Sequence, residues 1–98
     1  MVAESRSPRV HIELDGEYDI ARRQEVATAF AAVPAGTQEL VLHMESVTYV
    51  DSAFLHELAT LRNRLDGSRV TLIAPHPQLK RLLRLVAFDR LFRVVDTA

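Results

Sequence analysis

The chain contains no cysteine, and this absence excludes disulfide bonds, thiolate catalysis and zinc–thiolate sites together. It has no apolar run near the roughly 20 residues that a membrane-spanning helix needs. Residues 1–9 are largely polar, without the apolar segment of a secretory signal. The formal net charge is only −1, which gives no electrostatic basis for binding nucleic acid or an anionic membrane. We therefore expect a cytoplasmic protein without nucleic-acid partners and without direct membrane insertion.

Sequence motifs of catalysis and of cofactor binding are also missing. There is no Gly-rich phosphate loop and no G-x-S-x-G nucleophile elbow. His56 follows Ser52 on the same helical face, but a catalytic base there would need a third group and an oxyanion hole. The histidines are scattered without metal-ligand spacing: His11, His43, His56 and His76. We therefore predict no enzyme activity, no metal and no cofactor.

Two further functional patterns are not supported by the sequence. A phospho-aspartate receiver needs an acidic pair after its first strand and a lysine after a later strand. Asp15 and Asp19 are poorly spaced for such a pair, and Lys80 falls inside a predicted helix. Lys80, Arg81 and Arg84 form a basic stripe, which we interpret as the solvated face that this helix needs.

Four short segments carry the sequence patterns of β-strands. The first alternates apolar and polar residues with period 2, and Gly16 is expected to end it. The second and third are nearly unbroken apolar runs, as in central parallel strands. The predicted strands cover residues 10–14, 40–44, 70–74 and 92–95.

The segments between these strands have helical periodicity. Asp19 is expected to cap the first helix, and Pro77 stands where a helix-opening proline belongs. Gly67 is expected to close the middle helix in a left-handed conformation. Alternating strands and helices predict an α/β fold with a mostly parallel sheet of four to five strands and helices packed against it. We expect one domain, residues 1–98, with residues 1–8 as a flexible tail.

Functional groups of a parallel sheet gather in the loops after the carboxyl ends of its strands. The loops that qualify here are 16–19, 50–53 and 74–77. We expect the first two to place Asp19 near Asp51 and Ser52.

Asp51 and Ser52 mark an abrupt change from a β-rich apolar run to a strong amphipathic helix. Helix N-termini leave backbone N–H groups unpaired and carry a positive dipole, so they favour anions. Phosphorylation of Ser52 would add about −1.5 to −2 charge at one defined surface point. The simpler interpretation makes Asp51 or Ser52 only an N-cap, as at any helix start. The local pattern leaves both interpretations open.

The combination of these motifs resembles the STAS domain, the module of bacterial anti-sigma factor antagonists. The segment IELDGEYD, residues 12–19, is similar to the family's strand and its Gly-Glu-Leu-Asp loop. The apolar strand at 40–44, followed by VTYVDS at 47–52, resembles the family's Asp-Ser signature. The strand, helix and closing strand over 70–94 follow the family order, so the resemblance covers nearly the whole chain.

The chain departs from the family pattern directly after Asp51 and Ser52. The commonest continuation there is Ser or Thr and then Gly, whereas this chain has Ala53 and Phe54. Ala53 leaves Ser52 as the only hydroxyl candidate of the motif. Phe54 is either a core residue or a partner-facing anchor, and we favour the core. The usual N-terminal hairpin is also abbreviated, since only one predicted strand precedes Gly16.

The resemblance implies a partner-switching mechanism. The unphosphorylated protein would bind an anti-sigma factor that is also a serine kinase, and a sigma factor would be freed. The kinase would then phosphorylate the serine, the complex would dissociate, and a serine phosphatase would reset the system. By position, Ser52 is the implied phosphoacceptor, and Asp19 and Asp51 match the acidic positions around it. The implied partner-binding residues are Asp19, Asp51, Ser52, Ala53 and Phe54.

STAS-like domains also serve as subunits that do not switch. Examples are lipid-transport ABC complexes, other transporters and stress-signalling scaffolds, in which Ser52 would be only a cap and a contact residue. A nucleotide or other small ligand at the signature loops is a further alternative.

Overall fold

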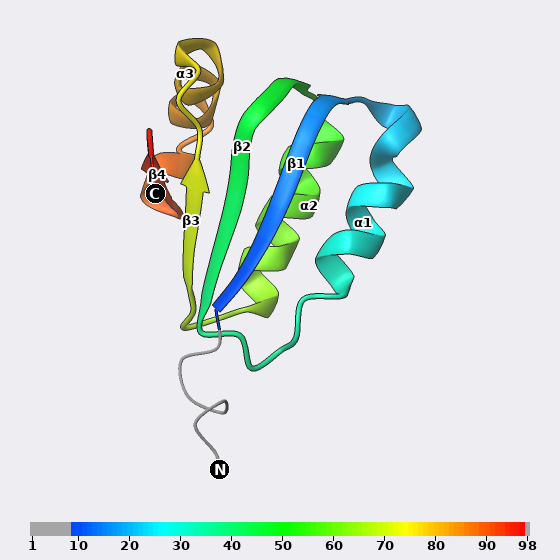
Figure 1. Cartoon of the computed structure of the whole chain (residues 1–98), viewed down its shortest axis with the longest axis vertical. Helices are drawn as coiled ribbons and strands as arrows, with labels where there is room; N and C mark the ends of the chain where they lie inside the picture. The colour runs from blue at the N-terminus through cyan, green and yellow to red at the C-terminus, as the bar shows by residue number, and fades with distance from the viewer. Residues whose placement is uncertain (1–8, 98) are drawn as a thin grey trace.

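The computed structural model describes residues 9–97, which form one four-stranded sheet with helices beside it (Figure 1). All three strand pairs are parallel, and the strand order follows the chain. The strands are β1 (Arg9–Tyr18), β2 (Glu39–Val50), β3 (Arg69–Ile73) and β4 (Arg93–Val95). The predicted α/β fold with a parallel sheet is therefore confirmed, whereas the tail predicted at residues 1–8 lies outside the described residues.

Helices connect the strands, as the periodicity predicts. They are η2 (Ile20–Arg22), α1 (Arg23–Ala31), α2 (Ser52–Arg64), α3 (Pro77–Leu85) and η3 (Phe88–Arg90), of which η2 and η3 are short 3₁₀ helices. In Figure 1, α2 lies behind β1 and β2 with α1 beside it, while α3 continues from the end of β3. Within residues 9–97, no helix is long and apolar enough to cross a membrane.

The core lies between the sheet and the helices α1 and α2, and α3 adds Leu79 and Leu83 to it. Alternate side chains of the strands point into it, and Leu40, Leu42, Leu58 and Leu72 are completely buried there. Because successive side chains of a strand point to opposite faces, the other face of β1 carries Arg9, His11 and Glu13, all exposed. This division explains the period-2 pattern at the start of the chain.

Gly16 does not end the first strand, so this prediction was wrong. The chain stays paired with β2 through Gly16 to Tyr18. Gly16 adopts a φ of 75°, which glycine tolerates without strain. The pairing register shifts on both sides of it, and each shift leaves one extra residue on β2, which makes two β-bulges. The bulges let β1 continue past the glycine and end later than the pattern suggests.

The carboxyl ends of the strands lie at different heights. Tyr18 at the end of β1 pairs with Val50 at the end of β2. In contrast, Ile73 at the end of β3 pairs with His43, in the middle of β2. The last part of β2 therefore has no strand on its β3 side, and α3 lies alongside it instead (Figure 1).

The local signals for helix ends agree with the structure. Gly67 has a φ of 85° and follows α2, which confirms the left-handed turn predicted there. Pro77 is the first residue of α3, where its missing N–H costs no hydrogen bond. These two residues fix where β3 starts after α2 and where α3 starts after β3.

Candidate functional site

The side chain of Asp51 is the cap of helix α2. Its Oδ1 accepts a hydrogen bond from the backbone N–H of Phe54 at 2.9 Å. Ser52 is the first helical residue and is exposed, and its hydroxyl takes part in no hydrogen bond recorded for residues 9–97. The N-cap interpretation therefore applies to Asp51 and not to Ser52, whose hydroxyl faces solvent at the helix N-terminus.

Asp19 uses the same capping geometry at the end of β1. Its Oδ1 accepts a hydrogen bond from the backbone N–H of Ala21 at 3.0 Å. The cap starts the 3₁₀ helix η2 and not α1 directly, so the predicted single helix is divided into two elements. Asp19 is exposed.

Asp19 and Asp51 follow two residues that are paired across the sheet. Tyr18 and Val50 are partners in the β1–β2 ladder, and the N–H of Asp51 donates to the carbonyl of Tyr18 at 3.1 Å. The first two loops therefore lie side by side, as the parallel order predicts. Two helical N-termini and two carboxylates thus converge on the neighbourhood of Ser52, although the functional roles of these residues stay predictions.

The third loop does not join this group. Ala74 donates its N–H to the carbonyl of Val95 at 2.9 Å, which ties the loop to β4. His76 Nε2 lies 2.7 Å from the carbonyl of Glu45 and donates to it, since a carbonyl only accepts. The loop before α3 is therefore held against the middle of β2. Of the three loops singled out in the sequence, only the first two therefore lie together, as expected for Asp19 and Asp51.

Phe54 belongs to the core. Its side chain is only 3% exposed, and its ring lies 5.1 Å from that of Tyr18 and 6.0 Å from that of Phe30, measured between centroids. This confirms the core interpretation and removes the Phe54 side chain from the surface that a partner can contact. Ala53 is half-buried, so the exposed part of the motif is chiefly Ser52.

Arg22 is a residue of this region that sequence reasoning missed. Its Nη1 donates to the carbonyl of Asp15 at 2.6 Å, and its guanidinium lies 4.1 Å from the ring centroid of Tyr18. Its Nη2 donates to Glu25 Oε2 at 2.6 Å. Arg22 thereby ties η2 to the end of β1, beside Asp19. Only the spacing of Arg22 and Glu25, three residues apart, could have signalled part of this network.

This ion pair also shifts acid–base equilibria. The hydrogen bond from Arg22, and then its positive charge, lower the pKa of Glu25 below the ordinary value of 4.5. The hydrogen bond to Glu25 in turn raises the pKa of Arg22, so both groups stay charged near neutral pH. Both are at the surface, where water weakens such pairs. We therefore assign the pair a local role in holding the loop.

The histidines are less scattered than their spacing suggests. His11 and His43 meet across β1 and β2, with Nδ1 and Nε2 separated by 2.8 Å and the rings stacked. His56 is exposed, and its ring makes no hydrogen bond to another of the described residues. In the described part of the chain, no cluster of three or more His, Cys, Asp or Glu residues could hold a metal ion.

The family of the chain follows from a sequence comparison. A family model described as "Mlab, STAS domain" matches residues 1–96. Because the match spans nearly the whole sequence, the chain belongs to the STAS domain family. A STAS-domain-containing protein of Pseudomonas aeruginosa (strain UCBPP-PA14) is 26% identical over 85 residues, which cover 85% of this chain and 84% of that protein.

Solved structures with the same fold include two kinds of protein. An anti-sigma factor antagonist from Mycobacterium paratuberculosis matches with a TM-score of 0.81 and 25% identity over 90% of this chain and 78% of that one. The STAS domain of a SulP transporter from Vibrio cholerae matches with a TM-score of 0.70 and 16% identity, over 94% and 75% of the two chains.

The unphosphorylated anti-sigma factor antagonist SpoIIAA matches with a TM-score of 0.58 and 20% identity over 93% of each chain. At this identity, and at that of the Vibrio domain, the likeness shows the fold alone. The fold thus occurs in antagonists and in a transporter domain, and the site must decide between these functions.

Proposed function

We propose that the chain is an anti-sigma factor antagonist that is switched by phosphorylation of Ser52. The observation that carries this proposal is that two adjacent residues at the start of α2 have different roles. Asp51 makes the capping bond, and the hydroxyl of Ser52 remains exposed next to it. The unphosphorylated form binds an anti-sigma factor that is also a serine kinase, in the cytoplasm where transcription takes place, and it performs no chemistry itself.

The absence of a neighbouring base supports a substrate role for Ser52 over a catalytic one. A nucleophilic serine needs a base within hydrogen-bond reach. Among the described residues, no side chain donates to or accepts from the Ser52 hydroxyl, and His56 is solvated on the helix surface. A kinase needs the opposite arrangement, a hydroxyl that protrudes and is free to enter another protein's active site.

The electrostatics of the site explain why the phosphate would act as a switch. The unmodified hydroxyl is small and neutral, so a partner can pack closely over it. Phosphate would add about −1.5 to −2 charge beside the carboxylates of Asp51 and Asp19. Covering that charge with a partner costs several kcal/mol unless a cation meets it. A difference of about 1.4 kcal/mol already changes affinity tenfold, so the modification suffices to dissociate a complex.

The relatives support this proposal to different extents. The Mycobacterium paratuberculosis protein is an anti-sigma factor antagonist and matches 90% of this chain at 25% identity. SpoIIAA is described in an unphosphorylated form, which implies a phosphorylated one, but its likeness supports only the fold. The match to an antagonist and the exposed Ser52 thus point to the same function.

Wild type and two variants of Ser52 test the proposal, with the anti-sigma kinase whose gene lies nearest to the gene of this chain as the partner. Titration calorimetry is expected to show tight binding for wild type and Ser52→Ala, and binding weaker by about 2–5 kcal/mol for Ser52→Asp. With ATP, mass spectrometry should find one phosphate, on Ser52, and none on Ser52→Ala. Equal affinity of wild type and both variants, or stoichiometric phosphate elsewhere with Ser52 unmodified, would refute the proposal.

A second candidate is a STAS subunit that does not switch. It is favoured by the description of the matching family model, "Mlab, STAS domain", and by the Vibrio cholerae transporter domain. The Ala53-Phe54 continuation also departs from the switching pattern. In this case Ser52→Ala and Ser52→Asp would bind a transport ATPase equally well. Transporter genes beside this one, in place of a kinase gene, would favour this candidate.

A further inference from the structure

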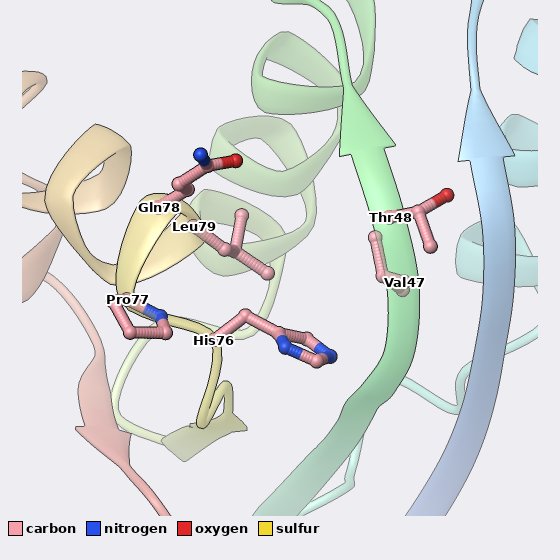
Figure 2. A pocket seen from close by; sticks show the side chains of 6 residues that line it. All are labelled: Val47, Thr48, His76, Pro77, Gln78 and Leu79. Atoms are coloured by element: carbon pink, nitrogen blue, oxygen red, sulfur yellow. The ribbon is translucent and has the colours of Figure 1, made fainter.

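A groove lies between the last part of β2 and helix α3, close to Ser52. It arises because β3 stops at the level of His43, so no strand covers this side of β2. One hollow of about 480 Å³ is lined by Val47, Thr48, His76, Pro77, Gln78 and Leu79 (Figure 2). A second hollow of about 190 Å³ shares part of this lining and extends to Tyr49, Val50 and Leu82. Together they form the β2–α3 groove.

The groove is apolar and continuous with the Ser52 site. Val50, in its wall, directly precedes the capping Asp51. Figure 2 shows Leu79 and the ring of His76 directed from α3 and its preceding loop toward β2. Tyr49, at the rim, is 53% exposed, an unusual state for so large an aromatic residue. Contact with the groove would therefore place a partner over the start of α2.

Helix α3 adds an exposed apolar anchor and positive charge. Gln78, Leu82 and Leu85 share one helical face by their spacing, and the first two line the groove. Leu85 is 74% exposed, the most among the large apolar residues of the described chain. Arg81 and Arg84 are exposed on the same helix, which has no acidic residue. Neither arginine belongs to an ion pair recorded within residues 9–97.

The shape of the groove favours a helix over an extended strand as the occupant. The part of β2 beside the groove carries both bulges of its ladder with β1, and bulges bend a strand and disturb the regular spacing of backbone groups that an added strand needs. One carbonyl of this part of β2, that of Glu45, is already occupied by His76. An amphipathic helix needs only an apolar groove with side chains at helical spacing, and Leu82 and Leu85 supply the matching anchors.

We propose that the β2–α3 groove binds an acidic amphipathic helix of the partner protein. Its apolar face packs on Tyr49, Leu82 and Leu85, and its carboxylates face Arg81 and Arg84. This inference rests on the proposed function in one respect, the effect of the switch. A phosphate on Ser52, two residues after Val50 at the end of the groove, would repel such an acidic helix directly. The acidity of the partner thus explains why phosphorylation would release it.

The test uses two designed peptides and the full chain. Each peptide has about 18 residues, enough for a stable helix. Leucines at helical spacing are flanked by glutamates in one and by lysines in the other. Because the chain contains no tryptophan, a single tryptophan in the peptide reports binding by fluorescence. We expect the glutamate peptide to bind, more weakly at high salt. In ¹⁵N NMR of the labelled chain, the amide shift changes caused by this peptide should centre on Tyr49, Leu82 and Leu85.

Variants locate the binding surface. Leu85→Gln should weaken binding of the glutamate peptide roughly tenfold or more, because it removes the most exposed apolar side chain on the helical face that carries Gln78 and Leu82. The matched control is Leu91→Gln, since Leu91 is also exposed, at 42%, but follows η3 and does not belong to this face of α3. Replacing both Arg81 and Arg84 by glutamate should reverse the preference, so that the lysine peptide binds. This exchange cannot be explained by loss of folding.

Other outcomes would overturn the proposal. Equal binding of both peptides, or binding that Leu85→Gln and Leu91→Gln weaken alike, would show that the groove does not recognise an acidic helix. Binding to phosphatidylglycerol vesicles through Arg81, Arg84 and Leu85, without peptide binding, would assign the surface to a membrane. Failure of the switch is a separate result. In that case Ser52→Asp would leave the glutamate peptide bound with unchanged affinity, while Leu85→Gln would still weaken it.

Discussion

Helices α2 and α3 both start after the carboxyl end of a parallel strand, yet the two starts differ in chemistry and in position. The start of α2 is capped by the side chain of Asp51 and carries the exposed Ser52. The start of α3 has a proline, and His76 before it makes no side-chain cap. Its ring is bonded to the backbone of β2 instead.

The difference follows from strand length. β2 continues well beyond the end of β3, so α2 begins at the edge of the sheet together with the end of β1. α3 begins lower, beside β2, and fills the position that a longer β3 would occupy. A loop between a strand and a helix thus serves two purposes in this fold. At the end of β2 it presents a modifiable hydroxyl, and at the end of β3 it builds the wall of a groove.

The largest effect expected from this comparison is on stability. Phe54→Ala should lower the free energy of unfolding by about 3–5 kcal/mol, because it removes an aromatic ring from between Tyr18 and Phe30. Leu79→Ala should cost less, about 2 kcal/mol, because Leu79 borders the groove and water can fill the space left. Urea denaturation measures both. A greater loss for Leu79→Ala would mean that α3 belongs to the core as fully as α2.

Much of this architecture could be predicted from the sequence. The helix stops and starts at Gly67 and Pro77 and the buried runs of β2 and β3 are local signals, and each was correct. The prediction failed at Gly16, because an isolated glycine suggests a strand end, whereas pairing with a bulged neighbour carries the strand past it. The sequence pattern of β1 carries no information on bulges in β2, its neighbour in the sheet.

The candidate site could be predicted in part. The order of parallel strands brings Asp19 and Asp51 together, and this is visible in the sequence. The choice of Asp51 over Ser52 as the cap depends on side-chain geometry, and the pattern left it open. The contacts of Arg22 join β1 and η2 through backbone carbonyls, which carry no sequence signal. The groove depends on where β3 stops. The sequence pattern of β3 does not reveal which residue of β2 lies beside the end of β3.

A smaller effect separates the two roles of Asp19. Asparagine caps a helix about as well as aspartate but carries no charge. Asp19→Asn should therefore keep the melting temperature within a few degrees, whereas Asp19→Ala should cost about 1 kcal/mol. If Asp19 adds to repulsion at the site, Ser52-phosphorylated Asp19→Asn should retain more partner affinity than the phosphorylated wild type. Calorimetry that finds the two phosphorylated proteins equal would leave Asp19 with capping alone.

The smallest effect concerns the ion pair of Arg22 and Glu25, which holds the loop of Asp19. The loop before α3 has no such ion pair among the described residues. The pKa of Glu25 is lowered by its hydrogen bond from Arg22. A carboxyl whose pKa is lowered on folding contributes stability above its unfolded value of 4.5, and this contribution is lost as pH falls through the lower folded value. The stability difference between wild type and Glu25→Gln should therefore be constant near neutrality and shrink below pH 4.5.

Urea denaturation across this range measures that difference, and the double variant Arg22→Gln with Glu25→Gln isolates the pair by a mutant cycle. The coupling should be present at neutral pH and disappear in acid, while the α3 wall of the groove is unaffected. Amide shifts of residues 79–85, which include no carboxyl group and no histidine, serve as the internal reference, because Glu25 is tied to η2 and not to α3. A coupling that persists unchanged well below pH 4.5 would show that packing of Arg22 on Tyr18, and not the charge of Glu25, holds the loop.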